Sequence, residues 1–311
     1  MTRSSPFTDR RLVVAIALLC CFLWGSAVPA VKIGYGLFAI APSDTASLML
    51  FAGVRFFLSG VILLGWSALT RKPIVQTPRR LGQLGLLGLI STAGQYLFYY
   101  IGLAHSTGVK VSITTSTSTF FSVLIAHFLY RDDKLTPRRM LGCLLGFLGV
   151  VAVNLAATGI DLHVSLLGEG FIVIAALLFS VGGVYGKGLS ADMDAGVMTG
   201  WQLLLGGAML GLAGLALGGR FGAFGLEAAL LLGYLAALSA AAFALWSVLL
   251  KHNPVGSIAI FNCAIPIFGV LLAGLFLGES IFEWKNLVAL LLVSVGIWMV
   301  TTQQPAARRT S

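Results

Sequence analysis

One hydrophobic unit occurs twice in this sequence, and the duplication constrains the fold more than any other feature. Residues 103–150 align with residues 250–297 without a gap, at an offset of 147 residues. The first apolar run of the chain matches the sixth at an offset of 155 residues. Each copy therefore contains five apolar runs. The aligned pairs include His105 with His252, Phe121 with Phe268, Asp132 with Glu279, and Lys32 with Lys187.

The composition places these runs in a membrane. Hydrophobic residues make up 58% of the 311 residues and charged residues only 10%, whereas a soluble domain carries about a quarter charged residues. Apolar runs of roughly 17–25 residues span a hydrocarbon core of ~30 Å as helices. We therefore predict ten transmembrane helices, over 12–33, 45–69, 81–103, 109–130, 137–157, 167–188, 196–218, 227–250, 256–277 and 284–302.

An odd number of crossings in each copy inverts the second copy relative to the first. The predicted fold is an all-α membrane protein, with ten transmembrane helices forming two inverted five-helix repeats around a central cavity. The repeats are expected to span residues 12–157 and 167–302. Because many membrane transporters use inverted repeats to build two interchangeable faces around one site, transport is the leading functional hypothesis.

The net charge of +9 lies mostly on one side of the predicted membrane. Fifteen of the 20 Lys and Arg residues fall on the side of the N-terminus, four fall on the opposite side, and Arg55 lies inside a helix. The positive-inside rule then places both termini in the cytoplasm. This basic excess reports topology and a mild attraction to anionic lipid. The expected partner is the lipid bilayer, with no role for nucleic acid.

The sequence carries no signature of an enzyme or a metal site. Cys20, Cys21, Cys143 and Cys263 lie in apolar runs without a His at metal-ligand spacing, so they are expected to pack as small apolar groups. Zinc-protease, esterase and phosphate-loop motifs are absent from the sequence. We expect no catalytic residue, no metal and no cofactor.

Glycine and proline within the apolar runs suggest how the helices pack and bend. Gly142, Gly146 and Gly149 line one face of the fifth helix, and small residues let membrane helices approach closely. A homodimer seam on this face is the alternative to packing within the chain. Pro29 and Pro266 each lack the amide donor for the carbonyl four residues earlier, so each is expected to kink its helix, as a fixed bend or as a hinge.

The third helix shows the clearest polar face. Gly88, Thr92, Gln95 and Tyr99 recur at spacings of four, three and four residues, so they are expected to share one side of the helix, flanked by Tyr96. Polar groups at membrane depth are costly against lipid. This face is therefore predicted to point into the bundle.

The fourth helix carries six consecutive hydroxyl residues, 114–119. Some must bond back to helix carbonyls, but Thr115 and Thr119 are expected to border a cavity. Helical rise then predicts a through-going cleft between the copies, whereas Phe98 and Tyr100 are expected to face lipid or packing. The predicted lining is Trp24, Gln95, Tyr96 and Tyr99 in the outer half, and Phe179, Tyr185, Gln202, Phe243, Trp246 and Asn262 in the inner half.

Arg55 is the one strongly charged residue near the middle of a predicted helix. It is expected to extend its charged end toward the membrane interface, to bond to backbone carbonyls, or to meet a substrate carboxylate. Every Asp and Glu falls at a helix end or in a loop. Because proton-driven pumps usually hold a carboxylate at depth, facilitated movement down a gradient is favoured.

These residues resemble a known family. The segment Phe-Leu-Trp24-Gly-Ser followed by Lys32, then Arg55-Phe-Phe, and Phe-Leu-Gly-Glu279 late in the chain are similar to motifs of the drug/metabolite transporter superfamily, in its bacterial branch with two EamA-type repeats. The resemblance covers about residues 12–302. It implies a bacterial inner-membrane location, a cavity built mainly by helices 1, 3, 4, 6, 8 and 9, and export of small metabolites, among them aromatic amino acids. The first copy departs from the motif, reading Tyr130-Arg-Asp.

The expected substrate is a small molecule, and an amino acid with an aromatic or otherwise apolar side chain is preferred. Tyr96, Tyr99, Trp24 and Trp246 are expected to stack on its side chain, while Thr115, Gln95 and Asn262 bond its polar head. A multidrug exporter differs from this hypothesis only in cargo. A sugar-phosphate or nucleotide-sugar exchanger is disfavoured because several phosphate charges need several cations. A membrane-embedded lipid enzyme would need convergent acids or a nucleophile beside a base.

Overall fold

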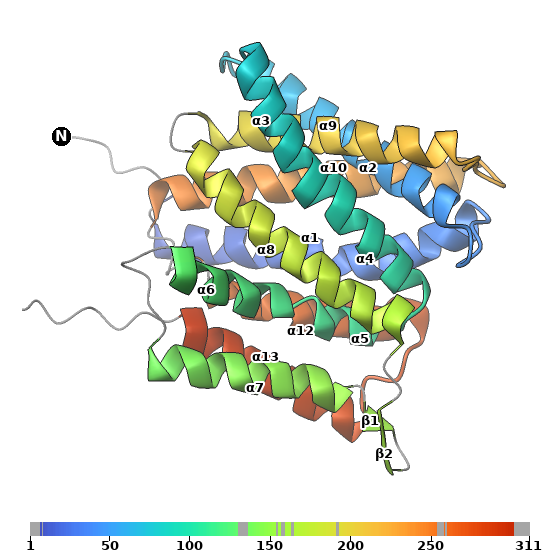
Figure 1. Ribbon diagram of the computed structural model, residues 1–311, viewed down its shortest axis with the longest axis vertical. Helices are drawn as coiled ribbons and strands as arrows, with labels where there is room; N and C mark the ends of the chain where they lie inside the picture. Colours follow the sequence, from blue (N-terminus) through green and yellow to red (C-terminus); the bar gives the residue numbers. More distant parts are fainter. Residues whose placement is uncertain are drawn as a thin grey trace, which may run out of the picture.

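The protein forms a bundle of long helices, some of which run obliquely across the others (Figure 1). This computed structural model describes residues 7, 9–129, 136–153, 155–156, 159–162, 165–190, 193–253, 258 and 260–301. In the first repeat the helices are α1 (Arg10–Leu37), α2 (Thr45–Leu69), α3 (Pro78–Gly88), α4 (Gln95–Ala104), α5 (Gly108–Thr114), α6 (Thr117–Leu129) and α7 (Pro137–Val153). In the second they are α8 (Phe171–Ser190), α9 (Ala195–Ala216), α10 (Leu226–His252), α12 (Ala264–Leu277) and α13 (Trp284–Thr301).

These elements form ten crossings, as the sequence predicted. Eight helical stretches are long and apolar enough to cross a membrane. The fifth and ninth crossings, α7 and the segment Phe261–Leu277, are shorter. In Figure 1, α1 begins and α13 ends at the left, which we name the terminal face; the opposite end is the distal face.

The predicted end of the fifth helix was wrong. Instead of continuing to residue 157, α7 stops at Val153, and two short antiparallel strands follow, β1 (Leu155–Ala156) and β2 (Gly159–Leu162). The ribbon lies on the distal face, where the chain passes from one repeat to the other (Figure 1). Leu155 and Ala156 of β1 have high helix propensity, so pairing with β2 rather than local preference accounts for the early end of the helix.

Short polar side chains fix where several helices begin. Asp9 accepts hydrogen bonds from the amides of Arg11 and Leu12, and Thr136 accepts one from the amide of Arg139, as N-cap residues do. Asp194 caps α9 and also pairs with Lys72 at 3.0 Å. Burial would raise the pKa of Asp194, but the Lys72 bond and the amides of α9 outweigh it and hold this pKa below its usual value.

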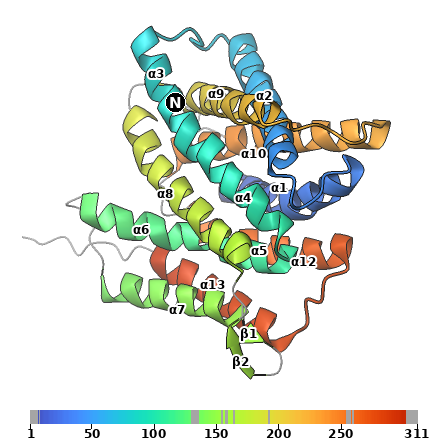
Figure 2. The same ribbon diagram turned by 45° about the vertical axis from the view of Figure 1, so that its right-hand side comes forward.

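Two glycine-rich seams join the repeats. Along α2 and α9, Gly53 lies against the backbone of Gly211, and Gly60 against that of Leu204. Along α7 and α13, a methyl group at Gly142 would approach the carbonyl oxygen of Gly296 to 2.9 Å. Figures 1 and 2 show α7 and α13 side by side.

The glycine face of the fifth helix is therefore used within the chain. Because α13 covers Gly142 and Gly149, a second copy cannot dock on this face as the alternative supposed. A homodimer through another surface stays a prediction.

Four of the described crossings contain a segment that is not regular α-helix. A π-helical segment, Leu89–Gly94, separates α3 from α4, and another, Leu166–Gly170, precedes α8. A turn at Thr115 and Ser116 separates α5 from α6. A 3₁₀ segment, Ile260–Cys263, precedes α12. Pro266 is the third residue of α12, in the first helical turn, where a backbone amide hydrogen bond is not required. Pro29, in contrast, lies inside α1, which continues past it without a break. A hinge role for either proline stays a prediction.

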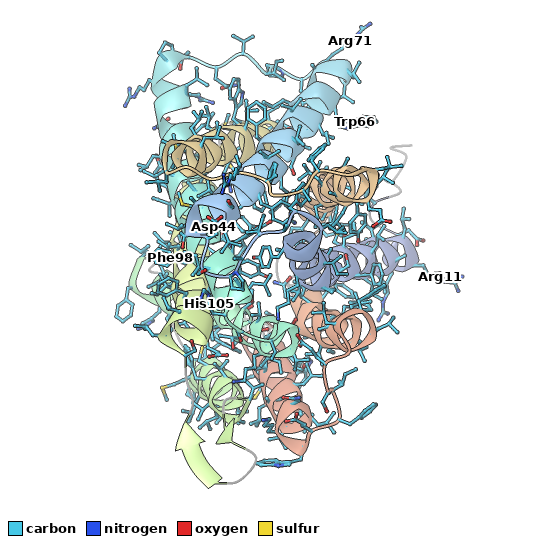
Figure 3. All side chains as sticks on the ribbon, turned by 90° about the vertical axis from the view of Figure 1, so that its right-hand side faces the viewer. Arg11, Asp44, Trp66, Arg71, Phe98 and His105 are labelled. Carbon is cyan, nitrogen blue, oxygen red and sulfur yellow. The ribbon has the colours of Figure 1, made fainter. Side chains whose placement is uncertain are left out.

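Large aromatic side chains also mark the outer surface. Figure 3 shows Trp66 and Arg71 projecting from the end of α2, and Trp66 is 61% exposed. Trp and Tyr near helix ends anchor membrane proteins at the lipid interface.

Candidate functional site

The distal half of the bundle is sealed by aromatic side chains. Tyr35, Phe38, Phe51 and Tyr100 are each at most 8% exposed. Their rings contact one another, with centroids of Phe38 and Phe51 5.0 Å apart and those of Phe51 and Tyr100 5.8 Å apart. The Tyr35 hydroxyl donates to the Tyr100 carbonyl at 2.9 Å. Tyr100 thus lies at the centre of this seal. The sequence predicts that Tyr100 faces lipid or fills packing space, and does not predict this central position.

Arg55 lies at the inner edge of this seal and is 4% exposed. Its Nη1 donates to the Tyr100 hydroxyl at 2.9 Å and its Nη2 to the Ser239 hydroxyl at 3.0 Å. Its guanidinium stands 4.7 Å from the centre of the Phe56 ring. Arg55 therefore joins α2 and α4 of the first repeat to α10 of the second.

Tyr96 and Tyr99 continue from Arg55 toward the middle of the bundle. The centroid of the Tyr96 ring lies 3.9 Å from that of the Phe56 ring and 5.9 Å from that of the Tyr99 ring. The Tyr99 hydroxyl interacts with the side chain of Thr115 on the neighbouring crossing. Both tyrosines are half-buried, so each keeps some accessible surface.

A second aromatic cluster contains Trp24, Phe243 and Trp246. The Trp24 ring lies 5.1 Å from that of Trp246 and 5.8 Å from that of Phe243. Phe243, Tyr96 and Tyr99 each pack against the same buried hydrophobic core, which includes Tyr100. We call Trp24, Phe243, Trp246, Tyr96 and Tyr99, which flank this core from α1, α4 and α10, the aromatic series.

The terminal half of the bundle is much less tightly packed. Residues 121–125 of α6, residues 243–246 of α10 and residues 261–265 at the start of the ninth crossing are all half-buried. Four or five consecutive helical residues at 100° each cover the whole circumference of a helix. These segments therefore keep accessible surface on every side, including the side that faces the bundle interior.

The other predicted lining residues are less clearly grouped. Thr119, Tyr185 and Asn262 are half-buried, and Phe179 is 43% exposed on α8. Gln95 is buried, and its side-chain oxygen has no hydrogen-bond partner among the described residues. Whether these side chains touch a substrate stays a prediction.

The shared face predicted for the third helix was wrong at its terminal-face end. Gly88 and Thr92 pack against Gly206 of α9, and Gln202 donates to the Thr92 hydroxyl at 3.4 Å. The π-helical segment places more than 3.6 residues in each turn, so it rotates α4 relative to α3. Tyr99 consequently reaches Thr115 while Thr92 meets α9.

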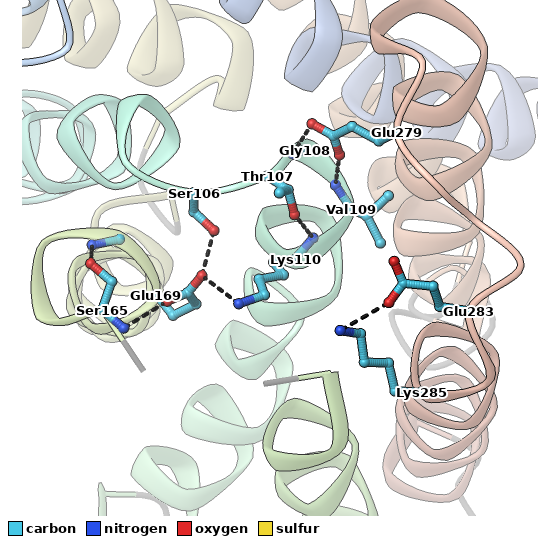
Figure 4. A network of polar contacts seen from close by, with 11 residues as sticks. Ser106, Thr107, Gly108, Val109, Lys110, Ser165, Glu169, Glu279, Glu283 and Lys285 are labelled. Carbon is cyan, nitrogen blue, oxygen red and sulfur yellow. Dashed lines mark hydrogen bonds and ion pairs between the residues drawn. The ribbon is translucent and has the colours of Figure 1, made fainter. Parts of the chain in front are cut away.

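Two carboxylates hold the distal end closed (Figure 4). Gly278 ends α12 in the left-handed conformation, with φ of 67°, and turns the chain so that Glu279 reaches α5. Glu279 accepts from the amides of Gly108 and Val109 at 2.7 and 2.8 Å and pairs with Lys32 at 3.4 Å. The sequence motif pointed to Glu279, but not to this role as a cap of the fourth crossing.

Glu169 makes the second distal contact. It accepts from the Ser106 hydroxyl at 2.6 Å and from the Ser165 amide at 3.0 Å, and it pairs with Lys110 at 3.5 Å (Figure 4). A shallow surface hollow of about 410 Å³ lies beside Ser106 and Lys110. This hollow opens on the distal surface, apart from the aromatic series.

The fold and this arrangement define a multi-pass membrane protein built from two repeats. The signature of the EamA-like transporter family matches residues 11–155 and again residues 166–302. The chain belongs to this family, and it is a membrane transporter.

Relatives in other organisms agree with this assignment. "Uncharacterized transporter YetK" of Bacillus subtilis (strain 168) is 27% identical over 84% of this chain and 81% of its own. "Uncharacterized transporter YvbV" of the same organism is 27% identical over 94% of this chain and 93% of its own. A solved crystal structure with 18% identity shares the fold, with a TM-score of 0.68 over 94% of this chain and 96% of that chain.

Proposed function

We propose that this transporter exports small metabolites, foremost amino acids with aromatic or other apolar side chains, across a bacterial inner membrane. The observation that carries this proposal is the aromatic series of Trp24, Phe243, Trp246, Tyr96 and Tyr99. It begins in the accessible terminal half and ends at the sealed distal half. Flat aromatic surfaces stack on apolar or aromatic side chains.

Polar groups beside the series suit the head of an amino acid. Thr115 lies beside Tyr99, Gln95 belongs to the same helix as Tyr99, and Asn262 belongs to the 3₁₀ segment before α12. One end open and the other closed is the arrangement that alternating access requires. The positive-inside rule makes the terminal face cytoplasmic, so the open half would receive cargo from the cytoplasm.

Facilitated transport is the proposed energetics. Acidic residues of the chain lie at helix ends or in loops, and the described Glu169 and Glu279 are already bonded at the distal end. A carboxylate that could carry a proton through the middle of the membrane is therefore not offered by the sequence.

Transport by purified protein in proteoliposomes tests this function. Labelled phenylalanine, tryptophan and leucine should move down their gradients, and Trp246→Ala and Tyr99→Ala should slow phenylalanine about tenfold by removing stacking surface. Trp66→Ala is the matched control, because Trp66 lies on the outer surface. Failure of the whole amino-acid panel would overturn the proposal, and unrelated drugs that compete for the same site would favour a multidrug exporter.

A further inference from the structure

Arg55 carries a positive charge that the described part of the protein does not neutralise. It is the eleventh residue of α2, ~15 Å along the helix at ~1.5 Å per residue, and so lies near the middle of the membrane. Its partners, the hydroxyls of Tyr100 and Ser239 and the ring of Phe56, are all uncharged. Its Nε is buried and has no hydrogen-bond partner among the described residues.

A buried guanidinium of this kind is stabilised more by a nearby anion than by additional uncharged hydrogen-bond partners. Removing a guanidinium from water is costly unless a counter-charge stands close by. Two described acids of the distal end, Glu169 and Glu279, are already paired with Lys110 and Lys32, and the described contacts of Arg55 include no acid. An anionic group that reached Arg55 would therefore neutralise a buried positive charge that has no described counter-ion.

The position of Arg55 gives such an anion a path. Ser239, which holds one guanidinium nitrogen, lies four residues before Phe243, so both occupy the same face of α10. Phe243 contacts Trp24, and Phe56 contacts the half-buried Tyr96. Arg55 thus stands at the distal end of the aromatic series, where a molecule entering from the terminal half would stop.

We propose that Arg55 recognises the carboxylate of the cargo. The site would then take molecules that combine an apolar or aromatic body with one carboxylate, including zwitterionic amino acids, and would disfavour their amides and amines. The carboxylate binds the free Nε and exchanges with the hydroxyl of Ser239 for the neighbouring nitrogen, making the paired bonds that a guanidinium offers best. The cargo's identity as an amino acid rests on the proposed function, but the carboxylate preference does not.

The competing explanation is that Arg55 only ties α2, α4 and α10 together. Thermal-shift titrations of the full-length protein in detergent separate the two, with phenylacetate and phenylacetamide as the probes. The wild type should bind phenylacetate at least about tenfold more tightly than the amide. Arg55→Gln should bring this ratio to about one, Arg55→Lys should leave it in between, and Arg220→Gln, in an exposed distal loop, should leave it unchanged.

Equal binding of the two probes by the wild type, or an unchanged ratio in Arg55→Gln, would overturn the proposal. If Arg55→Gln does not fold, Ser239→Ala decides. Losing this hydroxyl frees a guanidinium donor, so recognition predicts a higher ratio of carboxylate to amide affinity, whereas a purely structural Arg55 predicts lower stability with the ratio unaltered. Carboxylate binding without amino-acid transport would remove the proposed function and leave this site standing.

Discussion

The fourth crossing behaves differently in its two halves. In α5, at the distal end, every residue except Lys110 is buried, and Glu279 caps its first amides. In α6, toward the terminal face, Thr117 and Phe120 are the buried residues among the described side chains. A single crossing thus closes one half of the bundle and leaves the other accessible.

The difference teaches what seals a passage in a bundle of this kind. The distal half combines large interlocking rings with two carboxylates placed on helix starts and lysines. The terminal half of the same crossing offers small hydroxyl residues, several of which bond only to their own helix carbonyls, as Thr117 and Ser122 do. Such side chains satisfy themselves locally, so they do not bind a facing helix.

The largest effect is expected at the seam that both halves share. A side chain at Gly53 would collide with the backbone of Gly211, which cannot move aside. Gly53→Val should therefore cost more than about 4 kcal/mol and abolish the folded protein, as measured by the monodisperse yield in size-exclusion chromatography. Gly65→Val on the same helix, where the added side chain meets open space, is the control. A normal yield of Gly53→Val would show that the seam is not as tight as described.

The native cysteines measure the accessible half directly. Cys263 is half-buried at the start of the ninth crossing, whereas Cys20 and Cys21 are 0% exposed. A water-soluble maleimide should modify Cys263 at least about a hundredfold faster than either buried thiol, because these wait for local opening. Peptide mass spectrometry locates the label, and Cys263→Ser should abolish the fast phase. Equally fast modification of Cys20 or Cys21 in the folded protein would contradict the difference in accessibility between these thiols and Cys263.

The distal seal is tested by Glu279→Gln. This change removes the charge from the cap of α5 and from the pair with Lys32, and it should lower stability by about 1–2 kcal/mol. The measurement is the apparent melting temperature in detergent, where a drop of a few degrees is expected. Glu227→Gln removes an exposed charge at the start of α10 and should leave that temperature nearly unchanged. Equal effects of both changes would show that Glu279 does not hold the seal.

The smallest effect is expected at the terminal face, where Asp194 caps α9. Its pKa lies below the usual value of about 4, so its carboxylate stabilises the fold above that value and loses this contribution as the pH falls through the lowered pKa. Asp194→Ser keeps a capping oxygen without the charge. Melting curves between about pH 3 and 6 should therefore depend on pH less in this variant, by up to about 1 kcal/mol. Parallel curves would contradict the assignment.

Much of the fold could be predicted because the membrane imposes it. The lengths of the apolar runs predicted ten crossings. The odd number of crossings in each copy predicted that the second copy is inverted relative to the first. The π-helical segment Leu89–Gly94 was not foreseen, because Ser91, Thr92 and Gly94 were interpreted as ordinary polar and small residues of a regular helix. Around this segment Thr92 meets α9, whereas Tyr99 lies beside Thr115.

The candidate site was predictable in its residue types and less so in its contacts. Aromatic and polar residues at membrane depth identified Trp24, Tyr99 and Trp246 before their neighbours were known. Tyr100 lies four residues after Tyr96 and so shares its helix face, but it was missed because that face only flanks the row of Thr92, Gln95 and Tyr99 on which the prediction was based. Only the packing of three distant helices reveals that it holds Arg55.

The glycine seams limit how such a protein can change shape. A contact made of main chain has no rotamers to exchange, so α2 cannot slide along α9, nor α7 along α13, without lifting apart. We therefore expect these two pairs to act as fixed axes. Reorientation of the passage would then fall to the crossings that contain segments other than regular α-helix, the third, fourth, sixth and ninth, because their interrupted hydrogen-bond ladders bend at low cost.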